Sequence, residues 1–450
     1  MEIIDEHDED IDFDRSYGLV AVTANTQQAA RAYEIGREFG KRGVPAILGG
    51  IHATVLPEEA KQHFQSVAVG EAEGIWPAVL DDLKEGALKP FYRSRGPVDL
   101  SLMPAPRYDL LLGERYNLVW IQATRGCPHD CSFCVASSIF GKKVRYRPID
   151  QVVRDIAGIK ALWKHPNISF ADDNLVINRK YSLNLIRELR GLDIRYFLQS
   201  DISLAEDDEL LRQLKESGCS MIFIGFETVL DESLKRIDRK SFKHRYLQRY
   251  SSLIQKVQSM GIGVYGAFMV GFDEDTPESI KRLEDFICDN HLYASQITIL
   301  TPYPGSRIRR SLAVENRLLD LDWSHYNCTE VTFMPKNFPA SELQRAYNRL
   351  HQKVYSPEQI EKTTRYFIEK FKDLDRFRPD GLSFQHPGRD CDSGSLLRRC
   401  GDLGFGTRWI SGRGRRCAGG RLGRVVKIQQ STSAPGFRVG FQKALCWMRL

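Results

Sequence analysis

The sequence predicts an α/β protein with two successive parallel sheets, the second of which is an incomplete α/β barrel. Two observations lead to this fold class. Short apolar runs alternate with amphipathic helical stretches between residues 17 and 305, and six such runs follow one another after a proline-containing linker. Strands separated by helices pair in parallel, because each helix returns the chain to the same end of the sheet. A chain of 450 residues also exceeds the roughly 100–200 residues of a single domain.

The first sheet is expected within residues 1–95, which form a partial Rossmann-like unit. Three apolar runs are predicted strands, and amphipathic helices fit between them. The strands are residues 19–23, 45–48 and 67–69. The helix after the first strand places Ala32, Ile35 and Phe39 on one face. This alternation is typical of a sheet covered by helices.

Glycine and polar residues stand where these strands end. Thr23 ends the first strand, Gly49 and Gly50 end the second, and Gly70 and Glu71 follow the third. Parallel sheets bind ligands beyond the carboxyl ends of their strands, and glycine lets a ligand approach the backbone closely. Tight turns between strand and helix explain the same glycines. The pattern alone leaves both interpretations open.

Residues 96–112 form the predicted linker, and residues 113–305 form the predicted barrel. Its six strands are expected at residues 118–123, 168–171, 196–199, 221–224, 264–270 and 296–300. Helices fit between them, and the helix at 276–289 has Thr276 as its N-cap and Pro277 as its first residue. In barrels of this kind the chemistry takes place at the carboxyl ends of the strands.

The two remaining segments differ from the barrel. Residues 306–379 are expected to be a helical extension, and residues 380–450 an irregular basic tail. From residue 381 the chain has 11 Arg, 2 Lys and 3 Asp, with no apolar periodicity of useful length. Such a tail is typical of RNA binding, of a disordered extension or of out-of-frame translation. Because the rest of the chain is slightly acidic, we do not expect a nucleic-acid partner.

Composition excludes several classes of protein. Hydrophobic residues are 42% and charged residues 27% of the chain, which is typical of folded globular proteins. The longest uncharged stretch, Val257–Phe272, has 16 residues, fewer than the roughly 18 that a spanning helix needs. Eight acids among the first 14 residues argue against an export signal. We therefore expect a cytoplasmic protein without a transmembrane segment, whose ten cysteines are reduced or bind metal.

Three cysteines lie close together in the loop after the first barrel strand. Cys127, Cys131 and Cys134 form a Cys-x3-Cys-x2-Cys motif. Soft thiolates select iron–sulfur clusters or zinc, and a structural zinc normally has a fourth Cys or His nearby. His129 lies inside the run, but no second ligand pair follows it. A cubane cluster held by three cysteines keeps one iron open to an exchangeable ligand, which suits catalysis.

This spacing, with an aromatic residue before the third cysteine, resembles the motif of the radical S-adenosylmethionine superfamily. The resemblance implies that the three cysteines bind a 4Fe-4S cluster, whose open iron chelates the methionine part of S-adenosylmethionine. Reductive cleavage of the sulfonium then gives a 5′-deoxyadenosyl radical. The electron would come from a partner such as flavodoxin or ferredoxin. Phe133 is implied to pack near the adenine.

The resemblance extends the S-adenosylmethionine site to residues at the other strand ends. These are Asp172 and Asp173 on strand two, Gln199 on strand three, Glu227 on strand four, and Gly266 and Gly271 on strand five. In related enzymes the acidic residue of strand two meets the methionine ammonium, the glutamate of strand four reaches the ribose or methionine, and strand five lies by the adenine. A capping or turn role explains each residue taken alone. Arg239 and Lys240 could pair with the carboxylate, although a solvated basic run also explains them.

The N-terminal unit resembles the cobalamin-binding domain of one subgroup of this superfamily. The resemblance rests on residues 20–26, 48–54 and 69–73, and with the barrel it covers roughly residues 1–355. It implies that cobalamin contacts Thr23, Gly49, Gly50, Gly70 and Glu71. The chain opens at Glu2–Asp5, which corresponds to the second strand of relatives. We therefore expect the position of the first strand to be empty, an open sheet edge there and weak cobalamin binding.

The leading interpretation is a radical S-adenosylmethionine enzyme that methylates an unactivated carbon of a small-molecule or lipid substrate, with cobalamin as the methyl carrier. One alternative is a cyclase or oxidoreductase of the same superfamily, resembling the anaerobic magnesium-protoporphyrin cyclase. Another is a noncatalytic zinc-binding or RNA-binding protein. Release of S-adenosylhomocysteine separates a methylase from a cyclase, and iron with sulfide separates an enzyme of this kind from a zinc protein. The sequence does not indicate the substrate.

Overall fold

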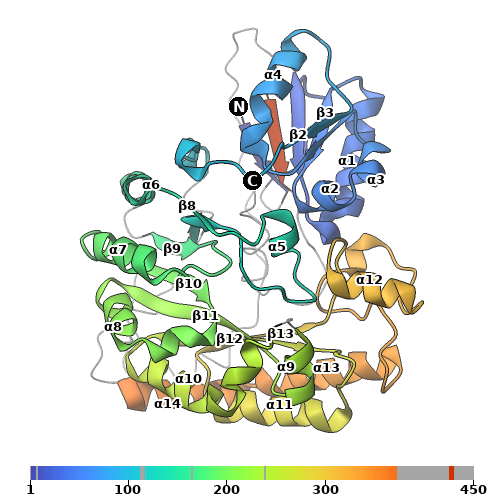
Figure 1. The fold of residues 1–450 in the computed structure, drawn as a ribbon. Coiled ribbons are helices and arrows are strands. Elements are labelled where there is room, and N and C mark those ends of the chain that lie inside the picture. Colours follow the sequence, from blue (N-terminus) through green and yellow to red (C-terminus); the bar gives the residue numbers. More distant parts are fainter. Residues whose placement is uncertain are drawn as a thin grey trace.

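The computed structural model of the chain describes residues 2–6, 9–111, 116, 118–163, 166–237, 240–371 and 425–429. Two six-stranded parallel sheets, each with helices packed against it, dominate these residues (Figure 1). Among the helices described, none has the length and hydropathy that a membrane crossing requires. The α/β fold class with two parallel sheets is thereby confirmed.

The N-terminal sheet has helices on both faces. Its first five strands along the chain are β1 (Glu2–Asp5), β2 (Leu19–Thr23), β3 (Ala46–Gly49), β4 (Ser66–Val69) and β5 (Phe91–Arg93), and its helices are α1 (Ala29–Lys41), α2 (Ile51–Val55), α3 (Pro57–Lys61) and α4 (Trp76–Lys84). Successive residues of a strand point to opposite faces. Val20 and Val22 therefore pack with Phe39 of α1, whereas Leu19 packs on the other side with Val79 of α4. The three strands predicted here are confirmed.

A strand from the C-terminal segment completes this sheet. β14 (Val425–Gln429) lies between β1 and β2, and the strand order is β1-β14-β2-β3-β4-β5 (red strand in Figure 1). It pairs in parallel with both neighbours. The expected empty position and open edge beside β2 are therefore wrong. The strand escaped prediction because only three of its five residues are apolar, Val425, Val426 and Ile428, and the segment around it is rich in glycine and arginine. The rest of the expected tail lies outside the described residues.

The second sheet is the incomplete barrel. Its strands are β6 (Val119–Ile121), β9 (Asn167–Phe170), β10 (Arg195–Ser200), β11 (Cys219–Glu227), β12 (Gly263–Val270) and β13 (Ala294–Ile299), in the order β13-β12-β11-β10-β9-β6. The helices that cover it are α6 (Ile149–Leu162), α7 (Arg179–Arg190), α8 (Asp208–Glu216), α9 (Asp231–Ile237), α10 (Tyr250–Ser259) and α11 (Pro277–Asp289). All six predicted strands are confirmed. So is the cap of α11, where the Thr276 hydroxyl accepts a hydrogen bond from the Ser279 amide.

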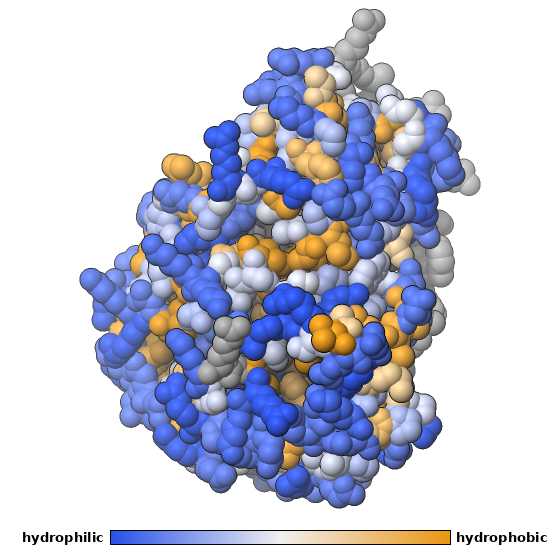
Figure 2. All heavy atoms as spheres, turned by 45° about the vertical axis from the view of Figure 1, so that its right-hand side comes forward, coloured by the Kyte–Doolittle hydropathy of each residue, from blue (hydrophilic) through white to orange (hydrophobic). Residues whose placement is uncertain are grey.

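The segment after the barrel is helical and touches both units. It contains α12 (Arg307–Val314), α13 (Ala340–Val354) and α14 (Pro357–Phe371). Leu343 and Leu350 of α13 are buried in the same core as the barrel helices. Between α12 and α13, the Trp323 indole donates a 2.6 Å hydrogen bond to Glu59 of the N-terminal unit. Figure 2 shows apolar side chains gathered in a band across the middle of one face, between the upper and lower parts of the molecule.

Candidate functional site

The three cysteines lie in a loop between two short strands. β7 (Thr124–Arg125) pairs antiparallel with β8 (Arg145–Tyr146), and we call residues 126–144 between them the cysteine loop. Gly126 opens the loop with a φ of 101°, and a Cβ there would lie 2.8 Å from the Lys143 carbonyl oxygen. Only glycine fits this conformation without strain. Backbone contacts then anchor the loop, because Cys127 N donates to the Gly141 oxygen and Ser132 N donates to the Ile237 oxygen.

The three thiols of this loop differ in their surroundings. Burial raises the pKa of Cys127 to about 12 and also raises the pKa of Cys131, whereas Cys134 is exposed. The Ala136 amide lies 3.4 Å from the Cys134 sulfur, the kind of contact that stabilises a cluster thiolate. Among the residues that the structure describes, no three His, Cys, Asp or Glu side chains converge as ligands of one ion do.

A buried ion pair lies beside these cysteines. Glu227 ends β11 in a left-handed conformation with a φ of 69°, which is rare for a residue other than glycine. Its carboxylate accepts a 2.7 Å hydrogen bond from Lys243, which also donates to the Gly225 carbonyl oxygen. Burial opposes the charge on Lys243, but Glu227 and the nearby Cys131 raise the pKa of this lysine. The sequence had instead suggested Arg239 and Lys240 as partners for a carboxylate; Arg239 lies outside the described residues.

The two acids after β9 have different surroundings. Asp172 is fully buried, and its two oxygens accept hydrogen bonds from the Ala123 and Thr124 amides. Burial raises the pKa of Asp172 to about 7. Asp172 therefore ties β7 to the end of β9; the methionine contact that the resemblance implies for it stays a prediction. Asp173 is half-buried and contributes to the raised pKa of Cys127. Gln199, at the end of β10, is also half-buried.

A histidine of the cysteine loop pairs with a carboxylate that the sequence did not single out. His129 Nε2 lies 3.2 Å from Asp201 Oδ2, and Asn174 donates a 2.6 Å hydrogen bond to the same oxygen. Burial alone would raise the pKa of Asp201, but hydrogen bonds from His129 and from the Ser203 hydroxyl and amide lower it to about 2. An ionised Asp201 therefore fastens the cysteine loop to the segment after β10.

Replacing Asp201 with asparagine is expected to lower the free energy of unfolding by about 2 kcal/mol at pH 7, which corresponds to a carboxyl pKa moved from 3.8 to about 2. Because the folded-state pKa lies below the unfolded one, this stabilisation is complete above pH 3.8 and is lost as the pH falls toward 2. The difference in the free energy of unfolding between D201N and the parent chain should therefore become smaller below about pH 4. Urea unfolding from pH 7 to pH 3 measures it, with Asp150→Asn on the exposed face of α6 as control. A difference independent of pH would contradict the assignment.

Gly266 in β12, Gly271 directly after it and Phe133 in the cysteine loop each have a structural role. A Cβ on Gly266 would lie 2.8 Å from the Phe268 ring and 2.9 Å from Leu292, so the missing side chain makes room for the core. Gly271 has a φ of 104°, and its amide donates a 2.7 Å hydrogen bond to Asp275. Phe133 is half-buried and packs against the barrel core. Adenine contacts by these three residues stay predictions.

The residues implied for cobalamin lie together at the carboxyl-terminal ends of strands in the N-terminal sheet. Thr23 and Gly49 are the last residues of β2 and β3, and Gly70 follows β4. Gly50 has a φ of 93°, and a Cβ there would lie 2.7 Å from the Ala24 oxygen. Thr54, which the sequence did not single out, donates to the Gly50 oxygen and accepts from the Gly70 amide. A Cβ on Gly70 would lie 2.9 Å from Ser94, so these glycines allow close packing of the chain itself, and the cobalamin contacts implied for this end of the sheet stay predictions.

Glu71 has a different environment from the other four residues. It is buried, and both of its oxygens accept hydrogen bonds from the arginines that flank the cysteine loop, Arg125 and Arg145. Burial alone would raise the pKa of Glu71, but the hydrogen bonds and charges of Arg145 and Arg125 outweigh it and lower the pKa. Its carboxylate is therefore occupied by protein groups, and a direct cobalamin contact by Glu71 does not follow from the structure. Arg125 stood next to the cysteine motif in the sequence, but nothing in the local pattern indicated a partner 54 residues earlier.

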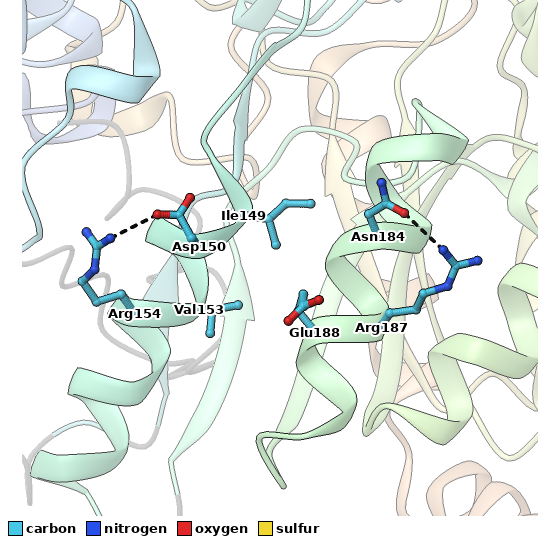
Figure 3. Close-up of a pocket in the computed structure, with 7 residues that line it drawn as sticks. All are labelled: Ile149, Asp150, Val153, Arg154, Asn184, Arg187 and Glu188. Carbon is cyan, nitrogen blue, oxygen red and sulfur yellow. Dashed lines mark hydrogen bonds and ion pairs between the residues drawn. The ribbon is translucent and has the colours of Figure 1, made fainter.

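A surface pocket lies apart from all of these residues. It has a volume of about 670 Å³ and is lined by seven residues of α6 and α7 (Figure 3). Its charged groups are engaged with neighbours on their own helices, since Arg154 donates to Asp150 and Arg187 donates to Asn184. The pocket lies on the outer helix layer and contains none of the predicted site residues. It is not part of the candidate site.

Comparisons with known proteins identify the family of the chain. The model of the radical SAM superfamily matches residues 121–287, and a domain of unknown function, DUF4070, matches residues 307–386. Bacteriochlorophyllide d C-12(1)-methyltransferase of Chlorobaculum tepidum is 30% identical over 353 residues, which are 77% of this chain and 76% of that protein. Bacteriochlorophyllide d C-8(2)-methyltransferase of the same organism is 29% identical, over 83% of this chain and 86% of that protein.

The fold has solved counterparts of the same kind. The radical S-adenosylmethionine methyltransferase TsrM from Kitasatospora setae, solved with cobalamin and a [4Fe-4S] cluster bound, superimposes with a TM-score of 0.56 at 20% identity, over 68% of each chain. The cobalamin-dependent S-adenosylmethionine radical enzyme OxsB superimposes with a TM-score of 0.52, over 82% of this chain and 55% of that one. The chain therefore belongs to the radical S-adenosylmethionine superfamily, as an enzyme related to its methyltransferases.

Proposed function

We propose that this enzyme cleaves S-adenosylmethionine reductively at a 4Fe-4S cluster held by Cys127, Cys131 and Cys134, and methylates an unactivated carbon with cobalamin as the methyl carrier. The observation that supports it best is the placement of the three thiols on one loop, beside the buried Lys243–Glu227 pair and the end of strand β11. When bound, the cluster would supply the electron for sulfonium cleavage and the cobalamin would supply the methyl group.

The residues around the loop have defined tasks in this proposal. The thiols of Cys127 and Cys131 are mostly buried, so the loop can keep water away from the reacting atoms. Glu227 is held in one orientation by Lys243, and Asp173 lies near Cys127. We assign these two carboxylates to binding the ribose or the methionine ammonium. The edge formed by Thr23, Gly49, Gly50 and Gly70 would hold the cobalamin.

The substrate class and the partner are also part of the proposal. We infer a small-molecule or lipid substrate with a large apolar surface, which the apolar band in Figure 2 supports. The relatives include a hopanoid C-2 methylase of Rhodopseudomonas palustris, 25% identical over 72% of this chain, in addition to the two bacteriochlorophyllide methyltransferases. A reductase partner of the flavodoxin or ferredoxin type would deliver the electron.

Anaerobic reconstitution of the full chain tests this function. We expect about four irons and four sulfides per chain, as in one cubane cluster, and release of 5′-deoxyadenosine when a strong reductant and S-adenosylmethionine are added. With hydroxocobalamin and a tetrapyrrole or hopanoid acceptor, S-adenosylhomocysteine should accumulate as well. Zinc without sulfide would refute the enzyme proposal, whereas 5′-deoxyadenosine without S-adenosylhomocysteine would favour a cyclase or oxidoreductase.

A further inference from the structure

The cysteine loop is closed by a ribbon in which two arginines face each other. In the β7–β8 pair, Arg125 is directly opposite Arg145, and Thr124 is opposite Tyr146. The two arginine side chains are only 4% and 15% exposed. Like charges directly opposite one another destabilise a ribbon, and burial strengthens the repulsion because water no longer screens it. A ribbon of two residues per strand has too few backbone hydrogen bonds to offset this by itself.

Two carboxylates from the N-terminal unit neutralise the arginines. Glu71 accepts hydrogen bonds of 2.6 and 2.9 Å from Arg145 and one of 2.8 Å from Arg125. Glu73 accepts a 2.9 Å hydrogen bond from Arg125. Two cations therefore meet two anions in a site with little solvent. Bidentate arginine–carboxylate pairs of this kind also restrict orientation, because the planar guanidinium fits the carboxylate in one plane.

The cluster of four charged residues is close in sequence both to the end of the N-terminal sheet at Gly70 and to the cysteine loop. Glu71 follows Gly70, whose amide is bound by Thr54 at the edge of the N-terminal sheet. Arg125 lies two positions before Cys127 in the sequence. Arg145 also donates to the carbonyl oxygen of Phe140, within the cysteine loop. A displacement of Glu71 would therefore move Arg125 and Arg145, which bind it directly, and with them the cysteine loop.

We infer that Glu71 and Glu73 are positioning residues, which hold the β7–β8 ribbon closed and thereby set the geometry of the cysteine loop from the N-terminal unit. The inference rests on the proposed function only in the assignment of this loop as a cluster site. It gives the glutamates that follow β4 a task that needs no contact with cobalamin. The loop that would bind the cluster is then correctly shaped only when the N-terminal sheet is in place.

Thiol alkylation of the full chain, without metal, tests the inference. In Glu71→Gln, Arg145 loses its carboxylate and Arg125 keeps only Glu73. We expect Cys127 to be alkylated about tenfold faster, because breaking a buried pair leaves an uncompensated charge. Cys219 and Cys288, which are buried in the barrel, serve as internal references whose rates should not change. Glu38→Gln, which removes an exposed carboxylate from its pairs with Lys41 and Arg42 on the same unit, is the matched control. Peptide mass spectrometry gives the rate for each cysteine.

A double variant separates repulsion from a simple loss of contacts. In Glu71→Gln with Arg145→Gln, Arg125 keeps Glu73 and faces no second cation, so we expect the Cys127 rate to return to within about twofold of the parent. A rate for E71Q equal to the parent, or a double variant as fast as E71Q, would overturn the inference. If E71Q yields too little folded protein, Glu73→Gln is expected to give about a threefold increase at this less buried position, and no increase would overturn it.

A second measurement distinguishes failure of the positioning role from failure of the proposed function. After iron loading, the electron paramagnetic resonance signal of the reduced cluster should change shape in E71Q and recover in the double variant. If no cluster forms in any variant but the alkylation rates follow the expected order, the positioning role stands and the proposed function fails. If clusters form and the signals and rates are identical in all variants, the positioning role fails and the proposed function is untouched.

Discussion

Replacing Cys131 with alanine is expected to abolish the bound iron and, with it, the release of 5′-deoxyadenosine, by at least about 100-fold. Two thiolates hold a cubane cluster too weakly to survive anaerobic gel filtration, because three cysteines already leave one iron open. Cys131 is the most informative of the three ligands because it is the most buried, near Lys243 and packed against the barrel core. Water or a buffer ligand has little access to replace it there.

Two other cysteine variants serve as matched controls for this result. Cys288→Ala removes a thiol from α11, and Cys328→Ala removes one that lies 3.0 Å from the Tyr303 hydroxyl, in both cases outside the cysteine loop. Both should keep about four irons per chain and near-parental cleavage of S-adenosylmethionine. Iron and sulfide analysis together with chromatography of the nucleoside product gives both readouts. A full cluster in C131A would show that the ligands have been assigned wrongly.

Local patterns predicted most of the fold. The six barrel strands and the start of α11 were predictable because apolar runs and a Thr–Pro cap act within a few residues of one another. The three-cysteine motif was predictable for the same reason, since its chemistry depends on spacing within eight residues. For these features the sequence contains the signal in one continuous segment.

Pairings between distant residues were not predictable in this way. Lys243 reaches Glu227 across 16 residues, and Arg125 reaches Glu71 across 54. Nothing in the sequence around these four charged residues indicates burial. Their charges are buried only when distant parts of the chain fold together. The same limit explains why Glu71 was assigned to cobalamin: its position after β4 was correct, but the arginines that occupy its carboxylate come from another unit.

Ending the chain at residue 424 is expected to destabilise the N-terminal sheet while leaving the barrel folded. β14 pairs with four residues of β1 and five of β2, and each backbone hydrogen bond contributes about 1 kcal/mol net. Loss of the strand should therefore cost the N-terminal unit on the order of 5 kcal/mol, comparable with the whole stability of many small domains. β1 is joined to the sheet through β14, so it should detach, and β2 should become an edge strand.

A chain that ends at residue 435 is the matched control, because it lacks 15 of the 26 residues that the shorter chain lacks but keeps Val425–Gln429. Limited proteolysis should cleave the shorter chain rapidly near Leu19–Thr23, and the longer one at the parental rate. The strands and cysteines of the barrel precede residue 305, so both chains should still load about four irons, although the shorter one should do so more slowly if Glu71 and Glu73 no longer hold the ribbon. Hydroxocobalamin titration should show binding to the longer chain only. Equal protease resistance of the two chains would mean that β14 does not support the sheet in solution.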